Sequence, residues 1–582
     1  MLLWLCAIKV AALILVLDPA GLVAFQLPKS LASRAFEWPI AAALAYALVT
    51  YGRAIVPRHR LHGLVAAVVA ASALSVVLAA DPYVAVFGDA EIHEGLTFVI
   101  DMALLYLAAA IAVRSERDVA VILGATMSAG AVAVAYGVAQ ATGWDPFTWA
   151  SDPRSRPFST FGNADHFGHF LSVFFAIALG AVIASTAVRT RLAAAAGIIV
   201  AIAIAAVVAT RATILGMGSA LVVAALVRRP TARALAYGAG AVLVAIAILA
   251  LTPLGQRVAS GGAIADRLQL YDIALRATAA RPVLGYGTDN FRAAFAANRT
   301  AESVVLLGPG PQATAHSWIL DASATTGVVG LLALLALIAF GTIELWRTAK
   351  RHPRVGIPLL LAWTAYWVDG LVAAASLAAV WFPWLALGVA VGLEGTTPTA
   401  VPARHLSRWL AVALSVVAIV AAATGARSWQ ANRDAWSAEE ATQAGEPDAA
   451  VTFADRAAAR DEGRADNWNR LGLAYEGARR DGDAVAAYRE ATRREPYEVV
   501  YWANLARGIA RSAGSNTAQR DEAISAARQG TIVDANSPIG HVALAEIATA
   551  FGRCDLAREQ AARAAALEAG HDDLVQRAAS CR

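Results

Sequence analysis

The chain has 582 residues, of which 58% are hydrophobic and only 16% are charged. With a mean hydropathy of +0.54 it is too apolar for an ordinary soluble globular protein, so lipid is expected to surround most of it. The formal net charge is only +4, and the arginines are spread over short loops, so nucleic acid is not an expected partner.

Apolar runs of about 17 to 25 residues recur up to about residue 425, and each is long enough to cross a bilayer as a helix. The predicted fold class is therefore all-α, a polytopic membrane protein with about 12 to 13 transmembrane helices. The first run is interpreted as a span, because no convincing signal-peptide cleavage site follows it. The predicted spans cover residues 2–17, 37–52, 62–80, 95–113, 119–139, 163–185, 192–209, 211–227, 232–252, 316–343, 356–374, 377–393 and 408–425.

Positive residues gather in every second loop between these spans, and such loops face the cytoplasm. The N-terminus is then cytoplasmic, while loops 81–94, 140–162 and 253–315 lie outside, together with the tail after residue 425. The cytoplasmic loops are marked by Arg53, Arg58, Arg60, Arg114, Arg117, Arg189, Arg191, Arg228, Arg229, Arg233, Arg347, Lys350, Arg351, Arg354, Arg404 and Arg408.

The outside loop before the sixth span has an unusually polar entry to a helix. It carries Arg154, Arg156 and Asn163, which are candidates for binding a diphosphate or a glycan. The acidic and imidazole side chains that follow could mimic a metal site, but the loop lacks further ligands and no metal is assigned. These side chains are Asp165, His166 and His169.

Further arginines converge on the same side of the membrane. Arg211 starts the eighth span at its outer end, and Arg267, Arg276 and Arg281 lie in the adjoining outside loop. Fixed guanidinium groups at an outer membrane surface suit a phosphate or diphosphate ligand. These residues are therefore predicted to take part in substrate binding.

His316 stands at the mouth of the next span, where a lone histidine is more often a polar cap. The arginines on the same side favour a catalytic role instead. Gly327 and Gly330 follow in the span, where glycines allow close helix packing. Asp101 and Asp369 are charges inside spans, which are costly in lipid and so suggest function, although either could merely pair with an arginine.

From about residue 431 the composition changes to charged, Ala-rich helix formers with the 34-residue period of tetratricopeptide (TPR) helix pairs. We therefore predict a membrane domain over residues 1–428 and outside helical repeats over 429–582. The repeats predict a concave surface for an envelope protein, although they could also only brace the membrane domain. Cys554 and Cys581 could pair there if the tail is extracytoplasmic. One nearly ideal repeat has Trp468, Leu471, Gly472, Tyr475, Ala484, Tyr488, Ala491 and Pro496 at the motif positions.

Several of these segments resemble the O-antigen ligase and O-antigen polymerase superfamily, which also includes bacterial protein O-oligosaccharyltransferases. The most specific likeness is His316-Ser317, followed after nine residues by Gly327 and, after two more, by Gly330. Other similar segments are Ser159 to Leu171, Thr210-Arg211-Ala212, and Arg267 to Phe291. The chain departs from the family pattern at Tyr271, where Trp is usual, at Ala164 and Asp165, and at Ala313 and Thr314.

The resemblance implies a GT-C-like glycosyltransferase of the bacterial inner membrane that needs no metal and no other cofactor. It implies a polyprenyl-diphosphate-linked glycan donor and a lipid, glycan or protein acceptor at the extracytoplasmic face. Arg211 and Arg267 would hold the diphosphate, and His316 would accept the proton of the acceptor hydroxyl. Asp369 would orient His316 or an arginine.

Three reactions share this donor chemistry: ligation to a lipid, polymerisation of repeat units and O-glycosylation of protein. The repeats slightly favour a macromolecular or envelope acceptor. A different class of function is a non-enzymatic envelope assembly scaffold, for which His316 and Arg211 would be dispensable. A flippase is less favoured, because its polar residues should line a path through the bilayer.

Overall fold

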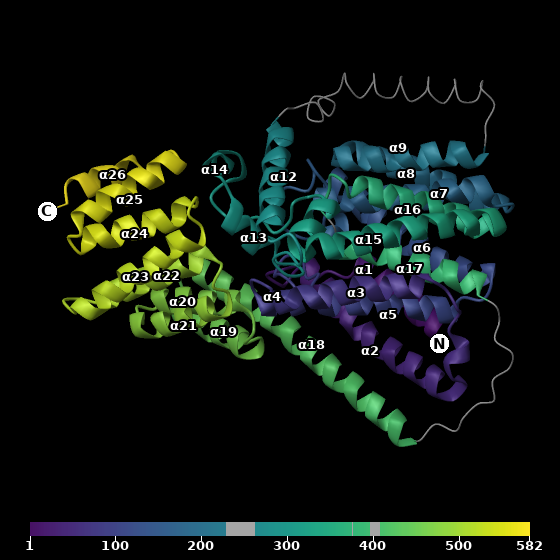
Figure 1. The fold of residues 1–582 in the computed structure, drawn as a ribbon, viewed down its shortest axis with the longest axis horizontal. Helices are drawn as coiled ribbons and strands as arrows, with labels where there is room; N and C mark the ends of the chain where they lie inside the picture. The colour runs from purple at the N-terminus through teal and green to yellow at the C-terminus, as the bar shows by residue number, and fades with distance from the viewer. Residues whose placement is uncertain (229–261, 375, 396–407, 582) are drawn as a thin grey trace.

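The computed structural model describes residues 1–228, 262–374, 376–395 and 408–581, and every regular element within these ranges is a helix. A bundle of long helices forms one part of the molecule and a stack of short helices the other, with α12 to α14 between them (Figure 1). The predicted all-α fold class is confirmed. The predicted span 232–252 lies outside the described residues.

Among the described residues, 6 helices are long and apolar enough to cross a membrane: α6, α7, α8, α9, α15 and α17. The helices α1, α3 and α5 are apolar but shorter. The elements up to α17 are α1 (Leu2–Leu15), α2 (Gln26–Tyr51), η1 (Arg53–Ile55), α3 (Leu61–Val77), α4 (Pro82–Phe87), α5 (Leu96–Ala112), α6 (Glu116–Thr142), η2 (Ser159–Phe161), α7 (Ala164–Ala184), α8 (Val188–Val208), α9 (Arg211–Arg228), α12 (Gly262–Ala280), α13 (Phe291–Asn298), α14 (Ala301–Leu307), α15 (Trp318–Arg351), α16 (Pro353–Asp369) and α17 (Leu377–Glu394).

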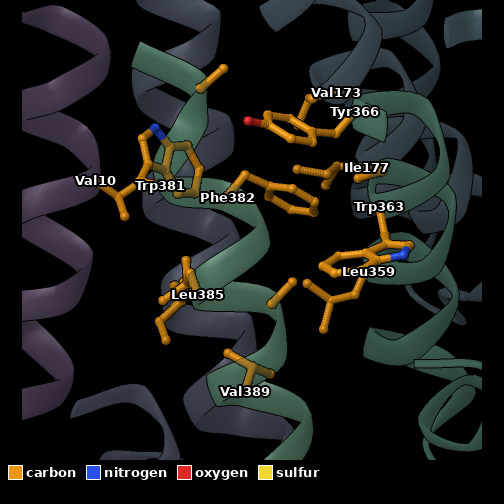
Figure 2. Close-up of a cluster of buried hydrophobic side chains, with 14 of the residues drawn as sticks. Val10, Val173, Ile177, Leu359, Trp363, Tyr366, Trp381, Phe382, Leu385 and Val389 are labelled. Atoms are coloured by element: carbon orange, nitrogen blue, oxygen red, sulfur yellow. The ribbon is translucent and has the colours of Figure 1, made fainter. Parts of the chain in front are cut away.

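Large apolar side chains fill the centre of the bundle, where α7, α16 and α17 pack together and α17 contacts α1 (Figure 2). Trp363, Trp381 and Phe382 are at most 2% exposed. Val10 of α1 lies beside Trp381, so the first helix belongs to this core. Because lipid is as apolar as these side chains, close packing rather than a hydrophobic effect holds such helices together.

Charged side chains buried in the bundle satisfy one another. Lys9 of α1 forms an ion pair with Asp101 of α5, and Ser33 of α2 donates a hydrogen bond of 2.5 Å to the same carboxylate. Lys29 of α2 donates to the carbonyl oxygens of Ile14 and Val16, where α1 ends. Asp101 thus pairs with a lysine of the first helix rather than with an arginine.

The loops at each end of the bundle hold to one another. At one end, where the basic loops gather, Arg114 Nη2 donates to the carbonyl oxygen of Ile55 at 3.1 Å. At the other end, the amide of Asp81 donates to Asn290 Oδ1 at 2.8 Å, which joins two of the loops predicted to lie outside. This grouping agrees with the alternation of loops, while the orientation relative to the cytoplasm stays a prediction.

The tail is a stack of antiparallel helix pairs in which α20 packs on α21, α22 on α23, and α24 on α25. A Cβ at Gly472 of α20 would lie 2.4 Å from the ring of Tyr488 on α21, so this position requires glycine. Cys554 and Cys581 form a disulfide. The helices are α18 (Arg408–Gln443), α19 (Pro447–Arg460), α20 (Ala465–Gly477), α21 (Asp481–Arg494), α22 (Val499–Ser512), α23 (Thr517–Val533), α24 (Pro538–Ala550), α25 (Cys554–Leu567) and α26 (Asp572–Ala579).

The repeats are docked on the loop that precedes α15. Between α13 and α14, Arg299 lies 3.2 Å from Asp534 of the repeats, and both side chains are 0% exposed. The same guanidinium donates to the carbonyl oxygens of Gly308 and Pro309 at 2.7 and 2.8 Å. Asn536 Nδ2 donates to the carbonyl oxygen of Arg299 at 2.7 Å. Because α18 also runs unbroken through the predicted domain boundary at 428, the two parts are joined along the chain and across this interface.

We predict that Asp534→Ala loosens this interface, because it leaves the Arg299 guanidinium buried without its counter-charge, at a cost of about 3 to 5 kcal/mol. Hydrogen–deuterium exchange of α13 and α14 in the full chain measures the effect, and faster exchange is expected. Asp555→Ala is the control, because the Asp555 side chain is fully exposed. Equal exchange in the two variants would show that docking does not depend on the buried pair.

Candidate active site

An arginine-lined cavity of about 490 Å³ opens between the start of α9, helix α12 and the segment after α16. Arg156, Arg211 and Arg267 line it, and we call it the arginine cavity. The structure thus brings together three arginines that the sequence places far apart.

Asp165, in the first turn of α7, holds two of these arginines. Its Oδ1 lies 2.9 Å from Arg156 Nη2, and its Oδ2 lies 3.4 Å from Arg267 Nη2. Arg267 Nη1 also donates to the carbonyl oxygen of Val372 at 2.8 Å. Three arginines and one carboxylate are among the described residues that line the cavity, and guanidinium groups at this spacing suit an anion with several oxygens.

The other two arginines predicted from the loop after α9 do not line the cavity. Arg276 pairs with Asp272, one turn earlier on α12, at 2.7 Å. Arg281 lies over the ring of Tyr286, 4.3 Å from its centroid. Arg281 also donates to the carbonyl oxygen of Leu78 at 3.3 Å, so the structure gives both arginines structural contacts away from the cavity.

Two residues of the loop before α7 also lie away from the cavity lining. Asn163 is the N-cap of α7, where its side chain accepts the amide of Asp165 at 2.8 Å. Arg154 lies beside Gly143 at the end of α6. Of the polar residues predicted in this loop to bind substrate, the structure places only Arg156 at the cavity.

His316 lies in the segment before α15 in a strained backbone conformation. Its φ of 55° falls in the left-handed region, which is uncommon for residues other than Gly. Such strain costs about 1 to 3 kcal/mol and is concentrated at functional sites. Within the described residues, the buried Nδ1 atom has no hydrogen-bond partner. The backbone therefore fixes an imidazole that keeps unused hydrogen-bonding capacity.

Burial, and then the nearby Arg267 cation, lower the pKa of His316 to about 4. The imidazole is therefore neutral at pH 7 and can accept a proton. An anion in the arginine cavity would offset the charge of Arg267. The pKa of His316 would then rise toward the range in which histidine is an effective general base.

Asp321 fixes the segment that carries His316. Its carboxylate accepts the hydroxyl of Thr314 at 2.8 Å and the amide of Ala315 at 2.7 Å. The Thr314 hydroxyl in turn accepts the amide of His316 at 3.0 Å. Sequence reasoning missed Asp321, although a carboxylate in the first turn of an apolar helix was a signal that could have found it.

Residues 168–335 match the family model described as O-antigen ligase. We call this segment the ligase domain, after the family to which it is similar. It contains Arg211, Arg267 and His316, whereas Arg156 and Asp369 lie outside it. The match supports glycan transfer of the ligase or polymerase type by a multi-pass membrane enzyme. None of the curated proteins matches the chain.

Two similar solved structures have low TM-scores against this chain. A thermophilic TPR protein of Thermus thermophilus is 20% identical over 30% of this chain and 93% of its own, with a TM-score of 0.23. The APC/C hetero-tetramer Cut9–Hcn1 is 14% identical over 82% of this chain and 75% of its own, also with a TM-score of 0.23. The description of the tail as TPR-like therefore rests on its own helix pairs and on the contact between Gly472 and Tyr488.

Within the ligase domain, helix α15 is interrupted at Gly327, whose φ is 67°. The backbone groups freed by the break pair with the loop after α12. The amide of Tyr286 donates to the carbonyl oxygen of Ala324 at 2.9 Å, and the amide of Val328 donates to that of Pro282 at 2.8 Å. A Cβ on Gly327 would lie 2.2 Å from a backbone oxygen of this loop. The sequence predicts that Gly327 allows close packing between helices. The structure corrects this prediction, because Gly327 breaks α15 and the loop after α12 packs against the break.

Asp369, just beyond the ligase domain, contacts α7 rather than His316. It is 0% exposed at the end of α16, and its Oδ1 lies 3.1 Å from His169 Nδ1. Ser172 donates to its Oδ2 at 2.9 Å. The prediction that Asp369 orients His316 or an arginine is therefore wrong, because α16 packs along α7 and presents this carboxylate to His169.

The imidazole groups at the start of α7 have separate partners. His166 bonds to Gln26 at 3.1 Å, and His169 lies against Asp369. Over the described ranges, no group of three or more His, Cys, Asp and Glu side chains could hold a metal ion. These residues therefore link α7 to α2 and α16.

We predict that Asp369→Ala destabilises the chain by about 1 to 3 kcal/mol, because it removes a buried carboxylate that accepts a hydrogen bond. Thermal unfolding in detergent measures this loss. Asp369→Asn can still accept from Ser172 and should lose less. Asp272→Ala, at a half-exposed surface pair, is the control and should unfold like the wild type. A fully stable Asp369→Ala variant that cannot transfer glycan would instead indicate a direct role in the reaction.

Proposed function

We propose that the chain transfers a glycan from a polyprenyl-diphosphate donor to an acceptor hydroxyl at the extracytoplasmic face of a bacterial inner membrane. The gathering of Arg156, Arg211 and Arg267 around one cavity beside His316 carries this proposal. The disulfide in the repeats supports an extracytoplasmic tail, because such bonds persist outside the reducing cytoplasm. The repeat domain would then lie on the same side as the site.

In the proposed reaction, the acceptor oxygen attacks the anomeric carbon of the donor sugar. The bond between that carbon and the phosphate oxygen breaks, and the polyprenyl diphosphate leaves with the electron pair. His316 takes the proton of the acceptor hydroxyl, and Arg211 and Arg267 stabilise the charge that grows on the leaving diphosphate. Arginines can supply this positive charge without a divalent metal, so chelators should not inhibit transfer.

A strained histidine beside a cationic cavity favours an enzyme over a non-enzymatic scaffold. A reaction needs a fixed proton acceptor, and the left-handed backbone holds the imidazole of His316 in place. A flippase is disfavoured because buried charges of the described bundle, such as Lys9 and Asp101, pair with each other. The repeat domain docked beside the site favours transfer to a large envelope acceptor over polymerisation.

We predict that His316→Asn lowers the transfer rate by about 10² to 10⁴-fold, the usual contribution of a positioned general base. Asparagine tolerates a positive φ, so this variant isolates the loss of the base from backbone strain. The assay uses the full chain in proteoliposomes with a polyprenyl-diphosphate-linked oligosaccharide and lipid, glycan or protein acceptors, and it follows release of polyprenyl diphosphate. Undiminished release with a stable variant would overturn the role of His316, and the acceptor that supports release would name the subclass.

The pH dependence gives a second prediction. Because the pKa of free His316 is about 4, its protonation should limit kcat/KM only below about pH 5. Arg267→Ala removes a cation that lowers this pKa, so the acidic limb should move to higher pH, and the rate should fall by about 10² to 10³-fold. Arg276→Ala, on the same helix but outside the cavity, should change neither the position of the acidic limb nor the rate. An acidic limb that does not respond to Arg267→Ala would show that another group titrates.

A further inference from the structure

A second cavity, of about 230 Å³, is lined by residues of the segment that carries His316. Thr314 and Trp318, which flank His316 in the sequence, line this second cavity. Arg267 and Asp165, whose charges act on His316, line the arginine cavity instead. His316 therefore neighbours lining residues of both cavities, along the chain for one and through the charges of Arg267 and Asp165 for the other.

Aromatic rings dominate one part of the second cavity. Trp318 of α15, Tyr366 and Trp367 of α16 and Trp384 of α17 line it, and we call it the aromatic cavity. The C–H face of a sugar ring packs on such rings, while its hydroxyl groups need polar partners at its edge. Apolar and aromatic walls with a few converging polar groups are the usual composition of a small-ligand site.

The polar groups of the aromatic cavity include atoms without partners. Glu94, Asp289 and Asp321 supply carboxyl groups, and threonine hydroxyls lie among them. Within the described residues, the buried Oε1 of Glu94 and the buried indole Nε1 of Trp367 have no hydrogen-bond partner. Buried polar atoms of this kind are rare in proteins and call for a ligand or water. A hydroxyl-bearing ligand could serve both, because a hydroxyl donates to one and accepts from the other.

The charge of the aromatic cavity excludes a diphosphate. No lysine or arginine is among the described residues that line it. Burial raises the pKa of Glu94 to about 8, and burial beside Asp89 raises that of Asp289 well above its usual range. Since the site disfavours even its own carboxylate anions, an anionic ligand would be disfavoured too. A neutral carboxyl group both donates and accepts, which suits an uncharged sugar.

We propose that the aromatic cavity binds an uncharged sugar ring of the acceptor and directs one of its hydroxyl groups toward His316. This inference rests on the proposed function, because it places the acceptor opposite the diphosphate of the donor. The acceptor is then a glycan or a glycolipid rather than a protein side chain. The sugar of the donor has the same chemistry, and the kinetic test below separates the two sources.

Protection of introduced cysteines from a maleimide tests the two cavities separately. Ala313→Cys reports on the aromatic cavity and Leu268→Cys on the arginine cavity. The native thiols should contribute little, because Cys6 is buried and Cys554 and Cys581 form a disulfide. The probes are glucose, galactose, mannose, N-acetylglucosamine and inorganic pyrophosphate, each added to the full chain in detergent.

At a concentration about ten times its Kd, at least one neutral sugar should slow labelling of Ala313→Cys about tenfold, while pyrophosphate should not. Pyrophosphate should slow labelling of Leu268→Cys instead. Protection of Ala313→Cys by pyrophosphate, or by none of the sugars, would overturn the sugar assignment and leave the proposed function standing. Failure of pyrophosphate to protect Leu268→Cys would count against the donor site of the proposed function.

A kinetic test in the proteoliposome assay then assigns the sugar to the acceptor or the donor. Glu94→Ala should raise the KM for the acceptor about tenfold, the effect of one hydrogen bond, and leave the KM for the donor unchanged. Glu302→Ala is the matched control, because Glu302 is an exposed acid outside the cavity. A rise in the KM for the donor alone would overturn the acceptor assignment. Equal KM values for the acceptor in Glu94→Ala and Glu302→Ala would overturn it too.

Discussion

Every charged group in the apolar bundle must find its partner inside the protein, because lipid offers none. Lys9 and Asp101 satisfy each other, and Lys29 is satisfied by carbonyl oxygens where α1 ends. These contacts fasten α1, α2 and α5 together near one end of the bundle. Glu94 and Phe98, close to Asp101 in the chain, line the aromatic cavity. The position of the chemistry therefore follows from the cost of charge in lipid.

The same constraint applies to the backbone of α15. A break inside a membrane helix exposes amides and carbonyl groups, and the loop after α12 restores their hydrogen bonds. The positive φ of Gly327 makes the break possible, and the loop in turn becomes fixed against the first turns of α15. Since these turns carry Asp321, which holds the His316 segment, the loop contributes to the geometry of the site without contacting it.

The sequence predicts helices well because apolar length and the repeat period are local properties. It also predicts that Arg211, Arg267 and His316 lie on one side of the membrane, because loop charge sets the side. It does not predict side-chain partners across helices, which depend on how the helices pack. Asp369 meets His169 for this reason, and Arg281 meets the ring of Tyr286 instead of the cavity. The sequence favours a packing role for Gly327, because a sequence does not show the positive φ that breaks the helix there.

The repeats are more than an appended binding module, because their docking reaches the segment that leads to His316. Arg299 is held by Asp534 and donates to the carbonyl oxygens of Gly308 and Pro309. The segment from there to α15 is thus fixed at its start by the repeat domain and at its end by Asp321. A residue held in a strained conformation needs such support from both sides. This arrangement favours a bracing role for the repeats, which does not exclude a partner on their concave face, and it makes the repeat domain part of the support of the site.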